Sequence, residues 1–391
     1  METCDALIVG GGPAGSTCAR QLRQQGMDVV VMDKAVFPRD KVCAGWITPE
    51  VVKALDIDVQ DYAHKRVFQP ITAFRTGLIG GKALETRYSA SVSFGIRRRE
   101  FDDYLLQRSG AQLRLGQAVK SLERHDQRWV INDSLSTPLI IGAGGHFCPV
   151  AQFLGAKLGT QEVAVAAKEI EFEMSLAQLD RCQVRPDTPE LYFCPDLKGY
   201  GWCIRKGRYL NIGLGREGSQ RLPEELRHFC DFLKQSGRIP EELPDRFHGH
   251  AYLLYGRSAR KLFDEGVLLV GDAAGLACPH SGEGIRPAVE SGLMAATTIM
   301  EAREDYRRHS LAAYHTRIQE RFGCVKPSRA IGPEFLRNLV AGSLLNNRWF
   351  TRHIVLDRWF LQTHQAGLST DSAHVARQAK EAGGVKETVE A

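Results

Sequence analysis

A glycine-rich turn close to the N-terminus has the spacing that a bound diphosphate requires. The run Gly10-Gly11-Gly12-Pro13-Ala14-Gly15 follows a short apolar segment, 5–9, and precedes a helical pattern that ends near 25. In a strand–turn–helix unit the first glycine permits the tight turn, the second admits a pyrophosphate, and the third lets helix and strand pack closely. Free N–H groups at the start of the helix attract the phosphates. The turn therefore predicts a dinucleotide site.

An acid in the right place supports this interpretation. Asp33 lies at the end of the next expected strand, 28–32, where a carboxylate accepts hydrogen bonds from ribose hydroxyls. Because strand, turn, helix and acid agree, a glycine turn without a ligand is the weaker explanation. These residues alone do not decide between NAD and a flavin dinucleotide.

A second glycine-rich segment lies far along the chain and carries its own chemistry. A short apolar strand, 266–270, runs into Gly271-Asp272-Ala273-Ala274-Gly275, and Pro279-His280-Ser281-Gly282-Glu283-Gly284-Ile285 leads into a long helix, 286–302. Asp272 can hydrogen-bond ribityl hydroxyls, and the N–H groups of Gly284 and Ile285 can stabilise negative charge on a reduced flavin. An NAD dehydrogenase has no need of this second site, so the two segments together predict FAD.

Over about residues 1–310 the chain resembles a flavoprotein family that contains p-hydroxybenzoate hydroxylase and the geranylgeranyl reductases, and the reductase branch is the more similar. The run Asp33-Lys34-Ala35-Val36-Phe37-Pro38-Arg39-Asp40-Lys41, with Cys43-Ala44-Gly45 after it, resembles a reductase segment that ends in Cys-Gly-Gly. Residues 98–105 resemble the family's R-x-x-F-D-x-x-L helix start. Residues 198–202 and 211–215 resemble the reductases' G-Y-x-W-x-F-P and N-V-G-x-G segments.

The resemblance implies a non-covalently bound FAD and a set of residues around it. Arg98 is expected near the ribityl and phosphate part of the cofactor, and Cys43 beside the isoalloxazine ring. The implied cofactor-binding residues are Gly10, Gly12, Pro13, Ala14, Gly15, Asp33, Lys34, Arg39, Lys41, Cys43, Ala44, Gly45, Arg98, Gly271, Asp272, Pro279, Gly282, Gly284 and Ile285.

Two departures from the family pattern bear on the chemistry. The family's Ala-Asp-Gly segment reads Ala143-Gly144-Gly145 here, and in the family's hydroxylases that segment serves both FAD and the pyridine nucleotide. The missing acid weakens the expectation that NAD(P)H donates the electrons. Arg205 stands where the reductases usually carry proline, which is a departure close to the expected substrate pocket.

Two side chains are catalytic candidates, and each has a structural alternative. Cys43 can shape the flavin site or transfer a proton, or it can be a small packing residue. His280, with an ordinary pKa of about 6.5, can donate a proton in the turn over the flavin, or it can face solvent. Tyr200 and Trp202 alternate in an expected strand and share one face, which either lines a substrate pocket or packs in the core.

The cysteines and the remaining histidines indicate neither a disulfide framework nor a metal site. The 10 cysteines form no CxxC pair, so reduced thiols and a cytoplasmic location are expected. Cys278 is expected to pack in the interior, with a redox pair between it and Cys43 as the alternative. His248 and His250 have no matching third ligand, so no metal is expected.

Composition is that of a soluble protein with two closely packed lobes. The chain has 391 residues, a net charge of +5 and 43% hydrophobic residues, and no nucleic-acid partner is expected from so mild a charge. No signal peptide is visible, and no apolar run approaches the roughly 20 residues of a membrane span. Residues 336–361 have an amphipathic pattern that predicts a helical cap or, alternatively, peripheral membrane contact. Residues 370–391 are polar and predict a surface helix or a frayed tail.

The expected fold is mixed α/β. A Rossmann-like FAD-binding lobe is assembled from 1–70, 95–155 and 255–310, and 311–391 form a C-terminal helical region. A substrate lobe with a mostly antiparallel sheet comes from 71–94 and 156–254, with strands expected over 163–173, 190–193, 201–205 and 209–215. A small hydrophobic or aromatic substrate is expected between the lobes.

The expected activity follows from the flavin. The leading hypothesis is hydride transfer from flavin N5 to a carbon–carbon double bond of a prenyl or similar hydrophobic substrate. The alternatives are an aromatic monooxygenase, a halogenase-like enzyme and, in a different class, a flavin-bound regulator without turnover. The sequence leaves the oligomeric state open.

Overall fold

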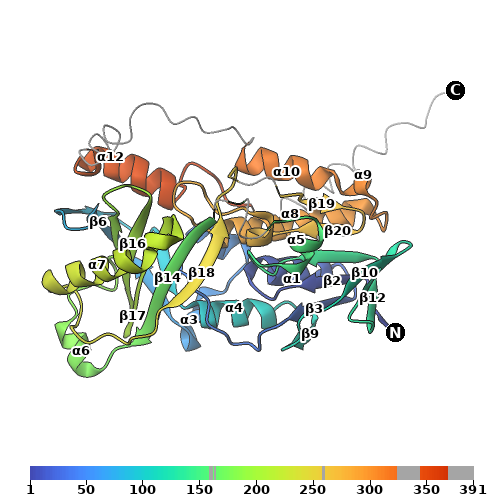
Figure 1. Ribbon diagram of the computed structural model, residues 1–391, viewed down its shortest axis with the longest axis horizontal. Helices are drawn as coiled ribbons and strands as arrows, with labels where there is room; N and C mark the ends of the chain where they lie inside the picture. The colour runs from blue at the N-terminus through green and yellow to red at the C-terminus, as the bar shows by residue number, and fades with distance from the viewer. Residues whose placement is uncertain (158–161, 163, 258–259, 324–343, 369–391) are drawn as a thin grey trace.

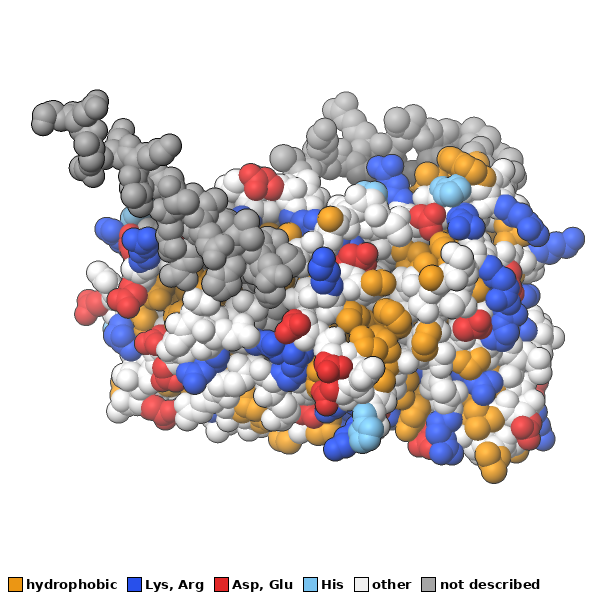
Figure 2. Space-filling view, turned by 180° about the vertical axis from the view of Figure 1, so that it is seen from behind, with side chains coloured by type: hydrophobic (Ala, Val, Ile, Leu, Met, Phe, Trp, Pro, Cys, Tyr) orange, Lys and Arg blue, Asp and Glu red, His pale blue; other side chains and the backbone are white. Residues whose placement is uncertain are grey.

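The structure is a computed structural model that describes residues 1–157, 162, 164–257, 260–323 and 344–368. Figure 1 shows two large sheets side by side, helices over both, and a C-terminal helical segment that crosses one edge of the molecule. On the face shown in Figure 2, Lys and Arg side chains are interspersed with Asp and Glu side chains. The expected mixed α/β fold with a Rossmann-like lobe, an antiparallel lobe and C-terminal helices is confirmed.

The first large sheet carries the expected nucleotide-binding unit. Its six strands follow the order β19 (Phe263–Asp264), β20 (Val267–Leu269), β13 (Leu139–Gly142), β2 (Ala6–Val9), β3 (Val29–Asp33), β9 (Gln112–Leu115). Every neighbouring pair is parallel except β19 with β20. Buried parallel strands are apolar on both faces because helices cover them, which explains the unbroken Ala-Leu-Ile-Val of β2. The covering helices are α1 (Pro13–Gln24), α4 (Arg98–Gln107), α5 (Pro149–Phe153) and α8 (Ile285–Ala302).

The second large sheet has seven strands. Their order is β18 (His248–Leu253), β14 (Ala164–Glu173), β17 (Tyr209–Glu217), β16 (Gly199–Lys206), β15 (Glu190–Phe193), β6 (Ala73–Leu78), β7 (Ala83–Arg87). All neighbours are antiparallel except β15 with β6. β16 and β17 are longer than expected because their pairing continues to Gly199 opposite Arg216. Residue 163 lies outside the described part, and the lobe boundaries stay a prediction.

The seven-stranded sheet separates two apolar layers because side chains alternate along each strand. Cys203 and Tyr192 face a layer that includes Phe229 of α7 (Leu222–Gln235). Trp202 and Phe193 face the opposite layer, which meets the C-terminal segment. The short α6 (Leu176–Arg181) follows β14, and a single-turn helix, η1 (Ser219–Arg221), precedes α7.

Smaller elements complete the fold around the two sheets. Three strands, β4 (Trp46–Ile47), β8 (Ser93–Ile96) and β5 (Phe68–Ile71), pair beside α2 (Pro49–Ala54) and α3 (Val59–Lys65). Four more, β1 (Glu2–Thr3), β12 (Leu135–Thr137), β11 (Arg128–Ile131) and β10 (Leu122–His125), form a separate sheet. A single-turn helix, η2 (Gly271–Ala274), follows β20.

The C-terminal segment packs on the body of the protein. It contains α9 (Arg308–Leu311), α10 (Ala313–Phe322), α12 (Arg348–Phe350) and a π-helix, η3 (Thr351–Phe360). Val355, Leu356 and Phe360 are buried against the face of the seven-stranded sheet that carries Trp202. The cap interpretation therefore applies to 344–361, whereas 336–343 and 370–391 fall outside the described residues. No described helix is both long and apolar enough to cross a membrane, and peripheral contact and a cytoplasmic location stay predictions.

Substitution of Gly15 by alanine tests the close packing of α1 on β2. An added Cβ would lie 2.0 Å from the Gly10 carbonyl oxygen, and crowding of this kind costs about 2 kcal/mol. We expect Gly15→Ala to lower the free energy of unfolding by that amount in urea titrations. The control is Gly249→Ala, since its Cβ would approach only the Ala167 carbonyl oxygen, at 4.0 Å. Equal losses in the two variants would contradict the packing argument.

Candidate active site

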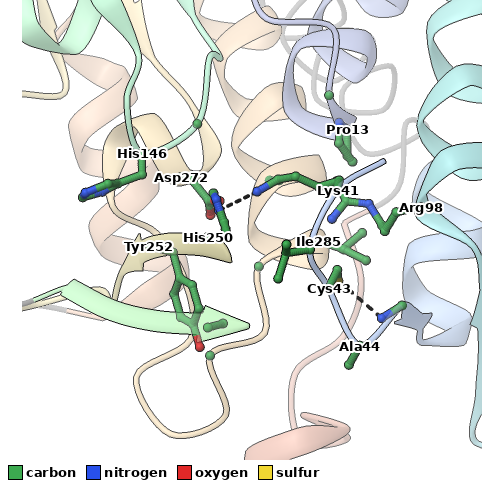
Figure 3. Close-up of a pocket in the computed structure, with 18 of the residues that line it drawn as sticks. Pro13, Lys41, Cys43, Ala44, Arg98, His146, His250, Tyr252, Asp272 and Ile285 are labelled. Atoms are coloured by element: carbon green, nitrogen blue, oxygen red, sulfur yellow. Dashed lines mark hydrogen bonds and ion pairs between the residues drawn. The ribbon is translucent and has the colours of Figure 1, made fainter. Parts of the chain in front are cut away.

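A cavity of about 340 Å³ lies where the two large sheets meet. The turn after β2, the loop after β3, the segment after β13 and the turn before α8 form one side, and β14, β16, β18 and the C-terminal segment form the other. The sequence-predicted residues that line it are Gly12, Pro13, Ala14, Asp33, Lys34, Arg39, Lys41, Cys43, Ala44, Gly45, Arg98, Asp272, Gly282, Gly284, Ile285, Tyr200 and Trp202. Figure 3 draws 18 of the lining residues, ten of them labelled, which come from these separate segments.

Three of the predicted glycines, Gly10, Gly15 and Gly271, lie next to the cavity but are not among the residues that line it. At Gly10 φ is +117°, and an added Cβ would lie 2.4 Å from the Ala143 carbonyl oxygen. Gly15 lies under the Gly10 carbonyl, and Gly271 has a φ of +59° beside Ala14. These positions bring the N-terminal turn against the ends of β13 and β20, and a contact between them and a cofactor stays a prediction.

His280 and Pro279 are exposed and are not among the residues that line the cavity. The His280 ring stacks on Trp359 of η3, with ring centroids 5.5 Å apart and planes 24° apart. The turn therefore presents Ser281–Gly284 to the cavity and His280 to the C-terminal segment. The position of His280 outside the lining gives no support to its role as a proton donor, which stays a prediction. The sequence alone did not show to which side of the turn this side chain points.

The residues on the glycine-rich side fit the phosphates of FAD. Gly12, at the end of the turn after β2, is the N-cap of α1. No side chain caps the free N–H groups at this end of the helix. Arg39 Nη2 lies 3.6 Å from the position of an added Gly12 Cβ, and Arg39 Nη1 is buried with no hydrogen-bond partner among the described residues. Because a buried guanidinium N–H without an acceptor is costly, this atom is suited to a phosphate oxygen. The two oxygens of Asp33 accept the N–H groups of Gly11 and Ala35, both at 2.8 Å.

Arg98 is paired inside the protein. Its Nε and Nη2 donate to the two oxygens of Asp102 at 2.7 and 2.8 Å, and Asp102 also lies 3.2 Å from Arg39 Nη2. Burial alone would lower the pKa of Arg98, but the Asp102 carboxylate raises it above its usual range. Asp102 therefore holds two guanidinium groups beside Cys43 and the N-terminal turn.

A second charged group crosses the cavity and includes a residue that the sequence analysis missed. Lys41 Nζ lies 2.5 Å from His250 Nε2, which is 3.5 Å from Asp272 Oδ2 (Figure 3). Burial lowers the pKa of Lys41 to about 8 and lowers that of His250. Burial opposes ionisation of Asp272, yet His250 and Lys41 bring its pKa down to about 2. His250 was considered only as a metal ligand, although alternation along β18 places it on the same face as cavity-lining Tyr252.

The opposite side of the cavity is aromatic and apolar. Trp46, Tyr200, Trp202 and Phe360 line it, and the Tyr200 and Phe360 rings meet edge to face with centroids 5.2 Å apart. The Tyr200 hydroxyl donates to the Ser281 carbonyl oxygen at 2.6 Å. The two interpretations of Tyr200 and Trp202 therefore coexist, because both side chains line the cavity and pack in the same core layer. Phe360 lies outside every motif of the sequence analysis.

Two acidic groups complete the site. Glu283 lines the cavity, accepts the Arg286 N–H at 2.7 Å, and has a pKa that burial raises to about 7. Glu169 lies behind the lining, where burial raises its pKa to about 8 and where it accepts the Cys43 N–H at 2.7 Å. Cys43 and Cys278 are both free thiols. In the described part of the chain, no three His, Cys, Asp or Glu residues are placed to hold a metal ion.

The low pKa of Lys41 predicts that the affinity for FAD, the cofactor that the resemblance implies, depends on pH. A protonated Lys41 would attract the two phosphates, and Asp272, His250, Arg98, Arg39 and Cys43 surround it. We expect FAD affinity to fall as pH rises above about 8, by at most about tenfold per pH unit. Fluorescence titration of the FAD-free protein between pH 7 and 9 measures this. Lys41→Arg keeps its charge over that range and should remove the dependence, so an equally steep fall in that variant would refute the role of Lys41.

Comparisons with known proteins show the family of this chain. The sequence profile of the FAD binding domain family matches residues 3–322. Geranylgeranyl diphosphate reductase of Rhodobacter capsulatus is 31% identical over 314 residues, which are 76% of this chain and 75% of that protein. Digeranylgeranylglycerophospholipid reductase of Methanococcus vannielii is 26% identical over 342 residues, 82% of this chain and 83% of the relative.

The fold agrees as well. A geranylgeranyl bacteriochlorophyll reductase-like protein from Thermoplasma acidophilum superposes with a TM-score of 0.70 at 22% identity, over 95% of this chain and 90% of that one. The glycine cradle, the unpartnered Arg39 N–H and the family profile point to the same cofactor. The chain therefore belongs to the FAD binding domain family, in its geranylgeranyl reductase-like branch, and is an FAD-dependent oxidoreductase.

Proposed function

We propose that this protein reduces carbon–carbon double bonds of an isoprenoid or a similarly hydrophobic substrate. The observation that carries the proposal is the aromatic side of the cavity, where Trp46, Trp202 and Phe360 face the glycine-rich side. Such a wall binds an apolar chain by burying its surface and offers it few hydrogen bonds. The names of the relatives from Rhodobacter capsulatus and Methanococcus vannielii support the same substrate class.

Some side chains of the cavity would bind the cofactor, and others would contact the substrate. FAD, when bound and reduced, supplies a hydride to carbon. Arg39 and Lys41 hold the phosphates, and the aromatic side excludes water from the reacting carbons. The second hydrogen must arrive as a proton, and Glu283, with a pKa of about 7, holds one in the cavity at neutral pH. The Cys43 thiol also lines the cavity, together with other proton-bearing groups such as Lys41 and Tyr252.

Anaerobic reoxidation tests the proposal directly. The FAD-loaded protein is reduced with dithionite and mixed with an unsaturated prenyl diphosphate or polyprenyl lipid. We expect the absorption of oxidised flavin to return and the product to gain two hydrogens by mass spectrometry. The fully saturated analogue is the control and should leave the flavin reduced. A flavin that stays reduced across the whole panel would contradict the proposal.

The alternative activities have different signatures when oxygen is admitted to the reduced protein. Oxygen-dependent oxidation of the reduced flavin that requires a phenol would indicate a monooxygenase. NADH and NADPH are tested separately as electron donors, because Ala143-Gly144-Gly145 lacks the family's acid. Failure of either nucleotide to reduce the flavin leaves the substrate test intact, since dithionite replaces the donor.

Phe360 is expected to limit the length of the substrate. It is buried and forms part of the aromatic side of the cavity. In Phe360→Leu the shortened side chain extends the apolar end, so kcat/KM for longer isoprenoids should rise relative to that for shorter ones. Filling or opening such a pocket by about one methylene changes discrimination by roughly tenfold or more. The control is Phe350→Leu, since Phe350 packs on Trp359 and is absent from the cavity lining. An unchanged ratio in Phe360→Leu would contradict this limit.

A further inference from the structure

A buried polar network joins the seven-stranded sheet to the loop that carries Cys43. The loop, 41–45, follows β3 and lines the cavity. Glu169 and Glu171 lie on β14, and Asn211 lies on β17 directly opposite Glu171. Glu169 and Asn211 are 7% and 1% exposed, so these two members of the network are closed to solvent.

Both polar groups of the Cys43 backbone end on this network. The Cys43 N–H donates to Glu169 Oε2 at 2.7 Å, and Asn211 Nδ2 donates to the Cys43 carbonyl oxygen at 3.1 Å. Two hydrogen bonds from opposite ends of one residue fix its orientation as well as its position. Because residues 41–45 lie outside the regular strands, these side-chain hydrogen bonds take the place of the backbone pairing that a sheet would provide.

The orientation of the Asn211 amide is itself determined. Its Oδ1 accepts the indole N–H of Trp202 at 2.7 Å, and an indole nitrogen can only donate. The amide nitrogen must therefore face the Cys43 carbonyl oxygen. Asn211 in this way links a side chain of the aromatic wall to the loop on the other side of the cavity.

Two cations, Lys206 and Arg97, neutralise the Glu171 carboxylate behind the loop. Lys206 is fully buried and its Nζ lies 2.8 Å from Glu171 Oε1, while Arg97 lies 3.2 Å from Glu171 Oε2. Burial opposes ionisation of Glu171, but Lys206 lowers its pKa. Burial raises the pKa of Glu169 to about 8, so this carboxyl is mostly neutral at pH 7. A neutral carboxyl still offers an oxygen to the Cys43 N–H, so the contact does not need the charge.

We propose that Glu169 and Asn211 are positioning residues that hold the Cys43 loop in the conformation that binds FAD. They act through the backbone of Cys43, and neither is among the residues that line the cavity. The proposal rests on the FAD site and not on the choice of substrate. Its readouts are FAD affinity and loop order, so they are separate from the reoxidation test.

The first measurement is FAD affinity of the full chain by fluorescence titration. Glu169→Ala leaves the Cys43 N–H without its acceptor, and we expect the dissociation constant of FAD to rise by about tenfold. Glu169→Gln keeps an acceptor oxygen of the same reach and should stay within about twofold of the unmodified protein. The matched control is Glu173→Gln, on the same face of β14 but exposed and paired with Arg208.

The second measurement is amide hydrogen exchange of peptides that cover 41–45, followed by mass spectrometry without FAD. Exchange should accelerate in Glu169→Ala and remain unchanged in Glu169→Gln and Glu173→Gln. Asn211→Ala removes the hydrogen bond to the Cys43 carbonyl oxygen. If Glu169→Ala does not fold, FAD affinity and hydrogen exchange are measured on Asn211→Ala instead. Unchanged affinity and unchanged exchange in the alanine variants would overturn the proposal, as would an equal loss in the Glu173→Gln control.

Discussion

The candidate site depends on a steric constraint at one place, where the turn after β2 lies directly against the segment after β13. No side chain fits between Gly10 and the Ala143 carbonyl oxygen. This contact places the N-terminus of α1 beside residues 143–147, and both line one rim of the cavity. The loop after β3 and the turn before α8 reach the same rim because β3 pairs with β2 and β20 pairs with β13 in the parallel sheet. A larger residue at the contact would separate segments that must act on one ligand.

Charge compensation is the second condition for this cavity. Asp102 pairs with Arg98 and Arg39, and Asp272 lies beside His250 and Lys41. Unpaired buried charges cost several kcal/mol each, so these pairs allow ionised groups to stand in a low-dielectric site before a ligand binds. Arg39 Nη1 has no hydrogen-bond acceptor in the described part of the chain, so an anion bound beside it would satisfy this atom. The same logic explains the fully buried Lys206 behind the Cys43 loop.

The C-terminal segment gives the cavity its apolar end, although the family profile stops at residue 322. It is anchored next to the cavity, where Arg286, which follows the lining residue Ile285 in α8, donates to the carbonyl oxygens of Gln362 and Gln365. Arg286 is itself paired with Glu290 at 2.9 Å, so the anchor starts from the helix whose N-terminus faces the cavity. The cofactor side is thus built from family motifs, while the substrate side includes a residue, Phe360, that no motif contains.

The sequence by itself determined the glycine-rich side of the cavity. Local glycine spacing, Asp33 and the turn before α8 are read within one strand–turn–helix unit, where neighbours in sequence are also neighbours in space. Glu169, Glu171 and Glu173 alternate along β14, a pattern that is ordinarily typical of a solvated strand face. Only the tertiary structure buried two of these acids under a loop from far earlier in the chain. It also turned His280 toward Trp359 and brought His250 and Phe360 to the cavity, because such long-range contacts follow from how the sheets pack and not from local spacing.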